Sequence, residues 1–244
     1  PRNVELARNY YSQAVFEGDM LALENDANLN YENGEHDKAI QALLTLKNPS
    51  DRSLMNLGHY YYNNQDYTAS ISYFERVNKL DKEYGKTIAD LADKMYVNDK
   101  IKAISFYEKS VDLDFEYVTS FRRIGNYYLK KDKRKAYNFL EKAVALNDPE
   151  GTCFLGYYHE QESNYYKAAE YYEKAIKLGY KKAYAYLGTL YKNGNGVKKD
   201  EEMAIECWKI AATADSQMAI KNLIKYYTYK RNQSEVNRWR RVLK

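Results

Sequence analysis

One short apolar pattern occurs seven times along the sequence, and its spacing restricts the fold more than any other feature does. In each copy an alanine is followed four residues later by a bulky apolar residue, and in most copies a small residue comes three positions further on. The alanines are Ala7, Ala39, Ala69, Ala103, Ala136, Ala168 and Ala204. Successive alanines lie 30 to 36 residues apart. A period of this length is typical of repeat proteins, in which each repeat covers the apolar face of its neighbour.

The composition favours helices throughout. The 244 residues include only 11 glycines and 3 prolines, whereas good helix formers are abundant. No apolar run approaches the roughly 18 residues that a membrane span requires. We therefore predict an all-α protein of fourteen or fifteen helices, arranged as a single helical-repeat array over residues 1–244. The array would hold about seven repeats, the first of them partial, and a basic capping helix near residues 233–244.

Two patterns inside the repeats carry a resemblance to known families. Leu155-Gly156, followed by Ala168, Tyr172 and Ala175, resembles the tetratricopeptide repeat, although His159 stands where that repeat has an aromatic residue. The resemblance implies a right-handed α-solenoid of antiparallel helix pairs, in which the small residue of the first helix lets the second approach closely.

The stretch that begins at Leu187-Gly188 resembles the related Sel-one-like repeat instead. It has a longer connection, Gly194-Asn195-Gly196-Val197, and Leu223 restarts the pattern after a spacing typical of that repeat. We predict that residues 194–199 form an exposed connection longer than the others, in which Gly194 and Gly196 can adopt positive φ at little cost. The stretch from Leu6 to Glu17 is expected to be a lone second helix, so that the chain would begin within a repeat.

The sequence contains no complete catalytic, metal-binding or phosphate-binding motif. The three histidines fall in different repeats, and the zinc motif that His159-Glu160 could begin is not completed. We find no nucleophile motif or phosphate loop, and we expect neither a cofactor, a metal nor an enzymatic activity. Cys153 and Cys207 are expected to be unpaired thiols, which favours a reducing compartment, and we expect a cytoplasmic protein.

The charge is concentrated at the C-terminal end. Between Met218 and Lys244 there are eight basic residues and one acidic residue, Glu235. Val236, Trp239, Val242 and Leu243 form an apolar stripe, so this end would be an amphipathic capping helix with a basic outer side. That side could also attract an acidic partner.

The families that the chain resembles hold proteins or peptides on a concave face lined by first helices. The leading hypothesis is therefore a non-enzymatic interaction scaffold or adaptor. Two alternatives remain open: a nucleic-acid-binding helical repeat that uses the basic end, and a self-assembling structural array. By resemblance, the partner-binding residues are Met55, His59, Tyr62, Asn63, Tyr96, Arg122, Asn126, Lys130, Tyr157, Glu160, Lys192, Asn193, Lys221, Lys225 and Tyr229.

Overall fold

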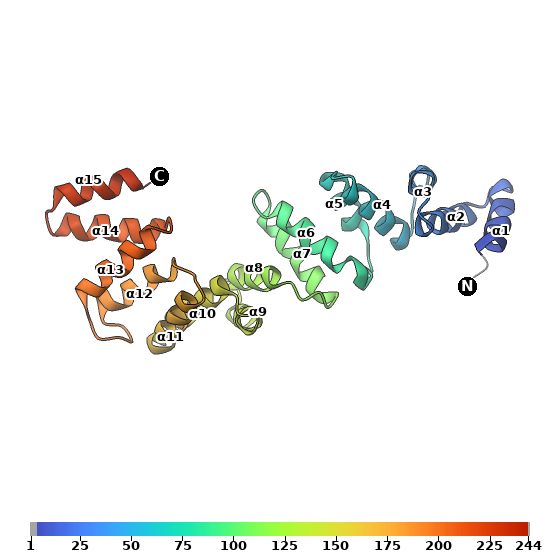
Figure 1. The fold of residues 1–244 in the computed structure, drawn as a ribbon. Coiled ribbons are helices and arrows are strands. Elements are labelled where there is room, and N and C mark those ends of the chain that lie inside the picture. The colour runs from blue at the N-terminus through green and yellow to red at the C-terminus, as the bar shows by residue number, and fades with distance from the viewer. Residues whose placement is uncertain (1–3, 244) are drawn as a thin grey trace. The chain divides into compact units, whose positions relative to one another are not determined.

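The structure, a computed structural model, describes residues 4–243. Within these residues the chain forms fifteen α-helices and one short 3-10 helix, with no strand (Figure 1). Helices that are adjacent in sequence pack in pairs, and the pairs follow one another along the chain. The predicted α-solenoid of helix pairs is confirmed.

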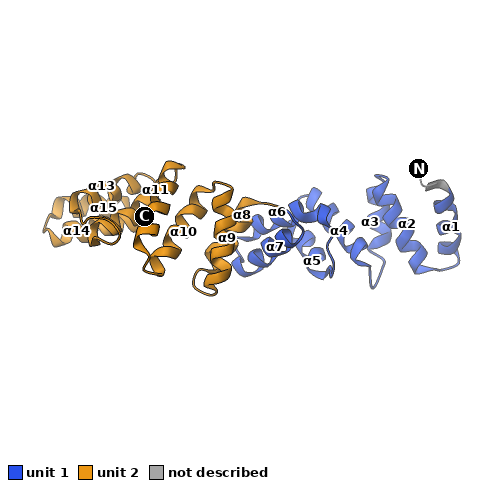
Figure 2. Ribbon diagram, turned by 90° about the horizontal axis from the view of Figure 1, so that it is seen from below, with its two compact units in different colours: residues 1–115 blue, residues 116–244 orange. Residues whose placement is uncertain are grey.

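The helices group into two compact units, which Figure 2 distinguishes by colour. A single array over residues 1–244 remains a prediction. Unit 1, Pro1–Phe115, contains α1 (Val4–Phe16), α2 (Met20–Glu32), α3 (His36–Leu43), α4 (Asp51–Asn63), α5 (Tyr67–Arg76), η1 (Lys82–Tyr84), α6 (Gly85–Met95) and α7 (Lys100–Asp112). Unit 2, Glu116–Lys244, contains α8 (Val118–Tyr128), α9 (Lys133–Ala145), α10 (Pro149–Gln161), α11 (Tyr165–Lys177), α12 (Ala183–Asn193), α13 (Glu201–Ala212), α14 (Gln217–Tyr229) and α15 (Gln233–Val242).

Capping side chains fix where the second helix of most repeats begins. The side chain of Asp66 accepts from the backbone N–H of Ala69 at the start of α5, at 3.0 Å. Asp132 and Asp200 do the same at the starts of α9 and α13. Each oxygen satisfies one of the amides that the first turn leaves without a partner. Asp148 caps the first helix α10 in the same way: its side chain accepts from Gly151 N at 2.5 Å, and Pro149 opens the helix.

The two helices of a repeat touch where the first has a glycine. A Cβ placed on Gly156 would lie 2.8 Å from the ring of Tyr172, and one on Gly125 would lie 2.7 Å from the side chain of Leu140. Tyr172 and Leu140 are fully buried. The close approach of the paired helices therefore depends on having no side chain at these positions.

In the repeat formed by α4 and α5, the predicted register is wrong by one residue. Ser70 and Phe74 are fully buried there, whereas Ala69 is only half-buried. Phe74 packs against Gly58, and the Ser70 hydroxyl donates to the Gly58 carbonyl at 2.8 Å. Serine fills the small position because its hydroxyl finds an acceptor inside the repeat.

The connection from α12 to α13, residues 194–200, is longer than the other connections within repeats, as predicted. Gly194 and Gly196 have φ values of 76° and 67°. The connection is exposed only in part. Lys198 and Lys199 reach solvent, whereas Gly196 lies against the backbone of Tyr165, at the start of α11.

The predicted helices at both ends of the chain are present. α1 packs against α2. Val236 and Trp239 of α15 are buried, and Leu243 packs against the same cluster as Trp239. Val242 is 40% exposed, so three of the four residues of the predicted apolar stripe face the protein interior.

Candidate functional site

Two cavities lie along the first helices, one in each unit. The cavity in unit 2 has a volume of about 660 Å³ and lies between α12 and α14, beside the start of α13. Four lysines line it, Lys192, Lys199, Lys225 and Lys230, with Glu201 as its one acidic residue. Trp208, Tyr226 and Tyr229 add aromatic surface. We call it the basic pocket. It brings together four of the predicted binding residues: Lys192, Asn193, Lys225 and Tyr229.

Glu201 neutralises only part of the charge in the basic pocket. It forms ion pairs with Lys192 and with Lys230, and hydrogen bonds from these two ammonium groups hold the pKa of its carboxyl below the usual value. Lys199 and Lys225 have no ion pair within residues 4–243. The Lys192 and Lys230 ammonium groups also lie over the ring of Tyr226, 5.4 and 5.5 Å from its centroid. The pocket thus combines excess positive charge with an aromatic wall.

The cavity in unit 1 has the opposite charge. It has a volume of about 600 Å³, and its lining comes from α2, α4, η1 with the residue before it, and α6. Glu32, Asp81 and Glu83 line it with Arg52 as the one basic residue. We call it the acidic pocket. The predicted residues Met55 and His59 both line it.

Burial keeps His59 neutral in the acidic pocket. Its ring lies 3.4 Å (Nδ1) from the Tyr31 hydroxyl and packs edge-on against Tyr84, with 5.8 Å between centroids. Burial lowers the pKa of His59, although the negative charge of Glu83 opposes this shift. The imidazole therefore adds no positive charge to the pocket near neutral pH.

Polar side chains beneath the acidic pocket form a buried network that the sequence pattern does not reveal. The Asn56 amide donates to Asn28 Oδ1 at 2.8 Å, and the Asn28 amide donates to Ser53 Oγ at 3.0 Å. Glu24 accepts from Ser53 Oγ and from Ser50 N, both at 2.6 Å. Burial alone would raise the pKa of Glu24, but these hydrogen bonds outweigh it and the pKa is lowered. The network links α2 to α4 and fixes the floor of the pocket.

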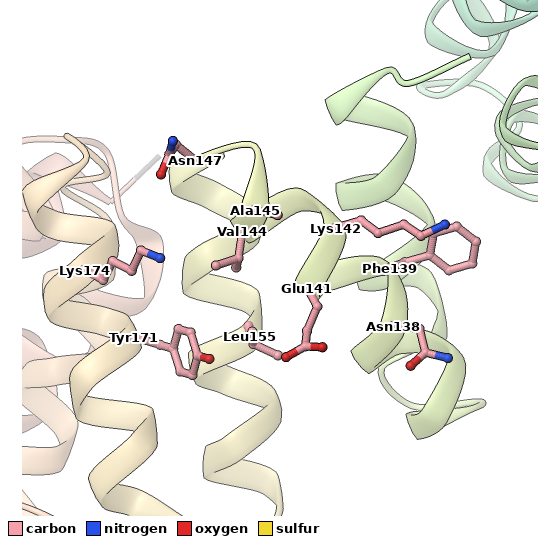
Figure 3. A pocket seen from close by; sticks show the side chains of 10 residues that line it. All are labelled: Asn138, Phe139, Glu141, Lys142, Val144, Ala145, Asn147, Leu155, Tyr171 and Lys174. Carbon is pink, nitrogen blue, oxygen red and sulfur yellow. The ribbon is translucent and has the colours of Figure 1, made fainter. Parts of the chain in front are cut away.

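A third cavity lies on second helices, where the sequence predicted no site. It has a volume of about 930 Å³ and is lined by α9, α10 and α11 (Figure 3). Two of its charged side chains have partners within the protein. Lys142 lies over the rings of Phe121 and Phe139, and Glu141 accepts from the Tyr137 hydroxyl at 2.5 Å. None of the predicted binding residues lines this cavity.

Several predicted binding residues make contacts within the protein. Arg122 forms ion pairs with Asp148 at 2.8 Å and with Glu150 at 3.3 Å. The Tyr62 hydroxyl donates to Asp90 at 2.8 Å. These contacts join neighbouring helix pairs.

Glu160 and Tyr157 also serve packing. Glu160 accepts from the Tyr172 hydroxyl at 2.5 Å, and burial raises the pKa of its carboxyl although this hydrogen bond opposes the shift. The ring of Tyr157 packs against Tyr186, with centroids 6.0 Å apart.

The remaining predicted residues lie outside the pockets. Tyr96 packs against Tyr107, and Asn126 is half-buried. Asn63, Lys130 and Lys221 are exposed. Lys130 lies in the turn after α8 and not on the helix, because α8 ends at Tyr128.

Residues 4–243 show no features of a metal site or a membrane span. In that range no three His, Cys, Asp or Glu side chains come close enough to hold a metal ion. None of the helices described is both long and apolar enough to cross a membrane. Cys153 and Cys207 are free and buried, which confirms that they are unpaired, and burial raises the pKa of both thiols.

Comparison with solved structures supports the fold. A Sel1 repeat protein from Oxalobacter formigenes matches with a TM-score of 0.55 and 24% identity, over 76% of this chain and 82% of that one. The antigen c5321 of uropathogenic Escherichia coli, which has an SLR fold, matches with a TM-score of 0.53 and 23% identity, over 91% of this chain and 52% of that one. MamA matches with a TM-score of 0.50 and 24% identity, over 69% of this chain and 93% of that one. No curated protein matches the sequence.

Family models account for most of the repeats. The tetratricopeptide repeat model matches residues 51–84. The Sel1 repeat model matches residues 1–15, 94–115, 123–148, 149–180 and 181–216, more than half of the chain. One of these matches, 149–180, covers the stretch whose Leu155-Gly156 pattern resembles the tetratricopeptide repeat. Repeats of both types are generally non-catalytic protein-interaction scaffolds. The chain belongs to the Sel1 repeat family.

Proposed function

We propose that this protein is a non-enzymatic scaffold that binds a partner protein or peptide along its first helices, with the basic pocket as a main contact for acidic side chains. The family supports the general role. The observation that carries the specific role is the basic pocket itself, where four lysines surround one glutamate beside aromatic rings. Ammonium groups bind carboxylates through charge-assisted hydrogen bonds, and aromatic walls bury the apolar part of a partner side chain.

The pocket favours a peptide over nucleic acid. Unspecific binding of single-stranded nucleic acid uses aromatic faces on which bases stack. At the basic end of the chain Trp239 is buried, and its indole N–H donates to Glu235 at 3.0 Å. Tyr229 is the well-exposed ring in the basic pocket, and the Lys230 ammonium group lies 6.0 Å from its centroid. This arrangement offers no series of stacking platforms.

The test is fluorescence anisotropy with a labelled, end-blocked peptide rich in glutamate and phenylalanine. A peptide with glutamine in place of every glutamate is its control. The double variant Lys199→Ala/Lys225→Ala should weaken binding roughly fivefold to tenfold, because it removes the two lysines that have no internal ion pair. The matched control is Lys181→Ala/Lys182→Ala, which removes the same charge from exposed positions before α12.

Equal weakening in both double variants would mean that only overall charge matters, and the basic pocket would then be rejected as the site. A labelled single-stranded RNA serves as the rival probe. If the RNA binds more tightly than the peptide and loses affinity steeply with salt, the nucleic-acid alternative replaces the proposal.

A further inference from the structure

The acidic pocket has an excess of negative charge that the protein does not neutralise. Glu32 forms an ion pair with Arg52, so this acid and this base cancel. Asp81 and Glu83 are exposed and have no ion pair among the residues described. Both carboxylates act on one phenol: burial and then the charge of Glu83 raise the pKa of Tyr84, and Asp81 adds to the effect. The two acids therefore share one pocket.

The floor of the acidic pocket provides hydrogen-bond acceptors. Thr87 is 8% exposed, and its hydroxyl has no hydrogen-bond partner among the residues described. Asn56 is 4% exposed, and its Oδ1 receives only a long bond of 3.5 Å from the Tyr84 hydroxyl. Because the Thr87 hydroxyl lines the cavity and is not engaged by another group of the described residues, it can accept a hydrogen bond from a ligand there.

The size and charge of the pocket together select the kind of ligand. Acceptor oxygens call for a ligand that donates, and the carboxylates call for a positive one. A bare metal ion fits poorly, because within residues 4–243 no three acidic, His or Cys side chains converge on one point. The volume of about 600 Å³ instead admits a long cationic side chain together with water. The aliphatic part of such a side chain would meet Met55 and the edge of Tyr31, which line the same cavity.

We propose that the acidic pocket receives a lysine or arginine side chain of the bound protein or peptide, held by Asp81 and Glu83 above the floor formed by Asn56 and Thr87. This inference rests on the proposed function in one respect: the cationic side chain belongs to a partner peptide or protein. It assigns the second pocket a chemistry opposite to that of the basic pocket.

The experiment is a titration of the full-length, isotope-labelled protein with N-acetyl-arginine amide, followed by amide and aromatic NMR signals. N-acetyl-citrulline amide, which is neutral and nearly the same shape, is the control ligand. We expect saturable shifts centred on His59, Tyr84 and Thr87 with the arginine compound alone. Asp81→Asn/Glu83→Gln should weaken this binding at least about tenfold. Glu202→Gln/Glu206→Gln, which removes two exposed carboxylates from α13, should leave it unchanged.

Equal shifts with citrulline would overturn the proposal, and so would shifts that persist in Asp81→Asn/Glu83→Gln or that spread over the whole surface. Folding of each variant is read from the same spectra, and the acidic peptide serves as an independent probe of unit 2. If Asp81→Asn/Glu83→Gln still binds the acidic peptide but the wild-type protein does not bind the arginine compound, the acidic-pocket proposal fails while the proposed function stands.

Discussion

At the residue scale, tyrosines act as core side chains whose hydroxyl groups also form hydrogen bonds. Tyr172 is fully buried against Gly156, yet its hydroxyl reaches Glu160 at 2.5 Å. A phenylalanine would fill the same space and leave the half-buried Glu160 carboxylate without this donor. Such pairs explain why tyrosine can be both abundant, with 28 residues, and largely structural in this chain.

His159 makes stability depend on pH. Burial lowers the pKa of its imidazole below the ordinary value of 6.5, and its ring stacks on Tyr171 with 5.2 Å between centroids. Between the lowered value and 6.5 the unfolded chain binds more protons than the folded one. The contribution of His159 to stability is therefore fully present above pH 6.5 and is lost as the pH falls below that value.

We expect His159→Phe to retain the stacking and reduce this loss, as measured by melting temperatures between about pH 8 and about pH 5. His59, whose pKa is also lowered by burial, would account for the decline that remains. An unchanged slope in His159→Phe would show that this imidazole does not contribute.

Arg122 should matter more for stability than for binding. Its guanidinium pairs with Asp148, whose side chain is 5% exposed and caps α10. Arg122→Met should cost about 2–4 kcal/mol of unfolding free energy, because it leaves a buried carboxylate without its cation. Urea denaturation measures this cost. Arg134→Met, which changes an exposed arginine of α9, is the control and should cost less than about 0.5 kcal/mol. A similar cost for both variants would contradict the buried pair.

The sequence predicted residue types better than residue partners. The aligned alanines and the Leu-Gly pairs indicated which side chains would be buried, since helical spacing determines the face on which a residue lies. The sequence could not show that Arg122 forms an ion pair with Asp148 or that Glu160 accepts a hydrogen bond from Tyr172. Those contacts cross between helices whose separation and rotation depend on packing. The two acids of the acidic pocket could not be predicted for the same reason, because Glu83 lies in η1 and Asp81 just before it, in a segment without periodicity.

At the scale of elements, the connection between α12 and α13 is held by a close contact as well as by its backbone angles. A Cβ on Gly196 would lie 2.4 Å from the carbonyl carbon of Tyr165. Gly196→Ala should therefore cost roughly 2–4 kcal/mol by combining the clash with an unfavourable φ. Gly179→Ala is the matched control, since Gly179 also has a positive φ, 96°, but open space around it.

The control Gly179→Ala should lower the free energy of unfolding by only about 1 kcal/mol. Thermal melting distinguishes the two variants. Equal losses would mean that the α12–α13 connection does not depend on its contact with α11.

At the scale of the whole molecule, stability should be local. Leu57 is buried in a cluster with Ala27, Ala39 and Leu43, all within unit 1. Leu57→Ala should lower the hydrogen-exchange protection of α2 to α5 by about 2–4 kcal/mol, while α12 to α15 stay unchanged, because repeats depend on their neighbours alone.

Leu223→Ala, in the cluster of α12 to α15, should give the reverse pattern. Exchange measured by mass spectrometry tests both variants. A uniform loss over the chain in either of them would indicate a single cooperative core instead.

The two tryptophans of the chain give it a built-in spectroscopic reporter with a limited view. Trp208 and Trp239 belong to the same cluster, formed by α12 to α15. Their emission should follow the melting of those four helices and ignore the rest of the chain, whereas circular dichroism averages over every helix. A denaturation curve recorded by fluorescence alone would thus describe one end of this protein, and its midpoint need not agree with the ellipticity midpoint.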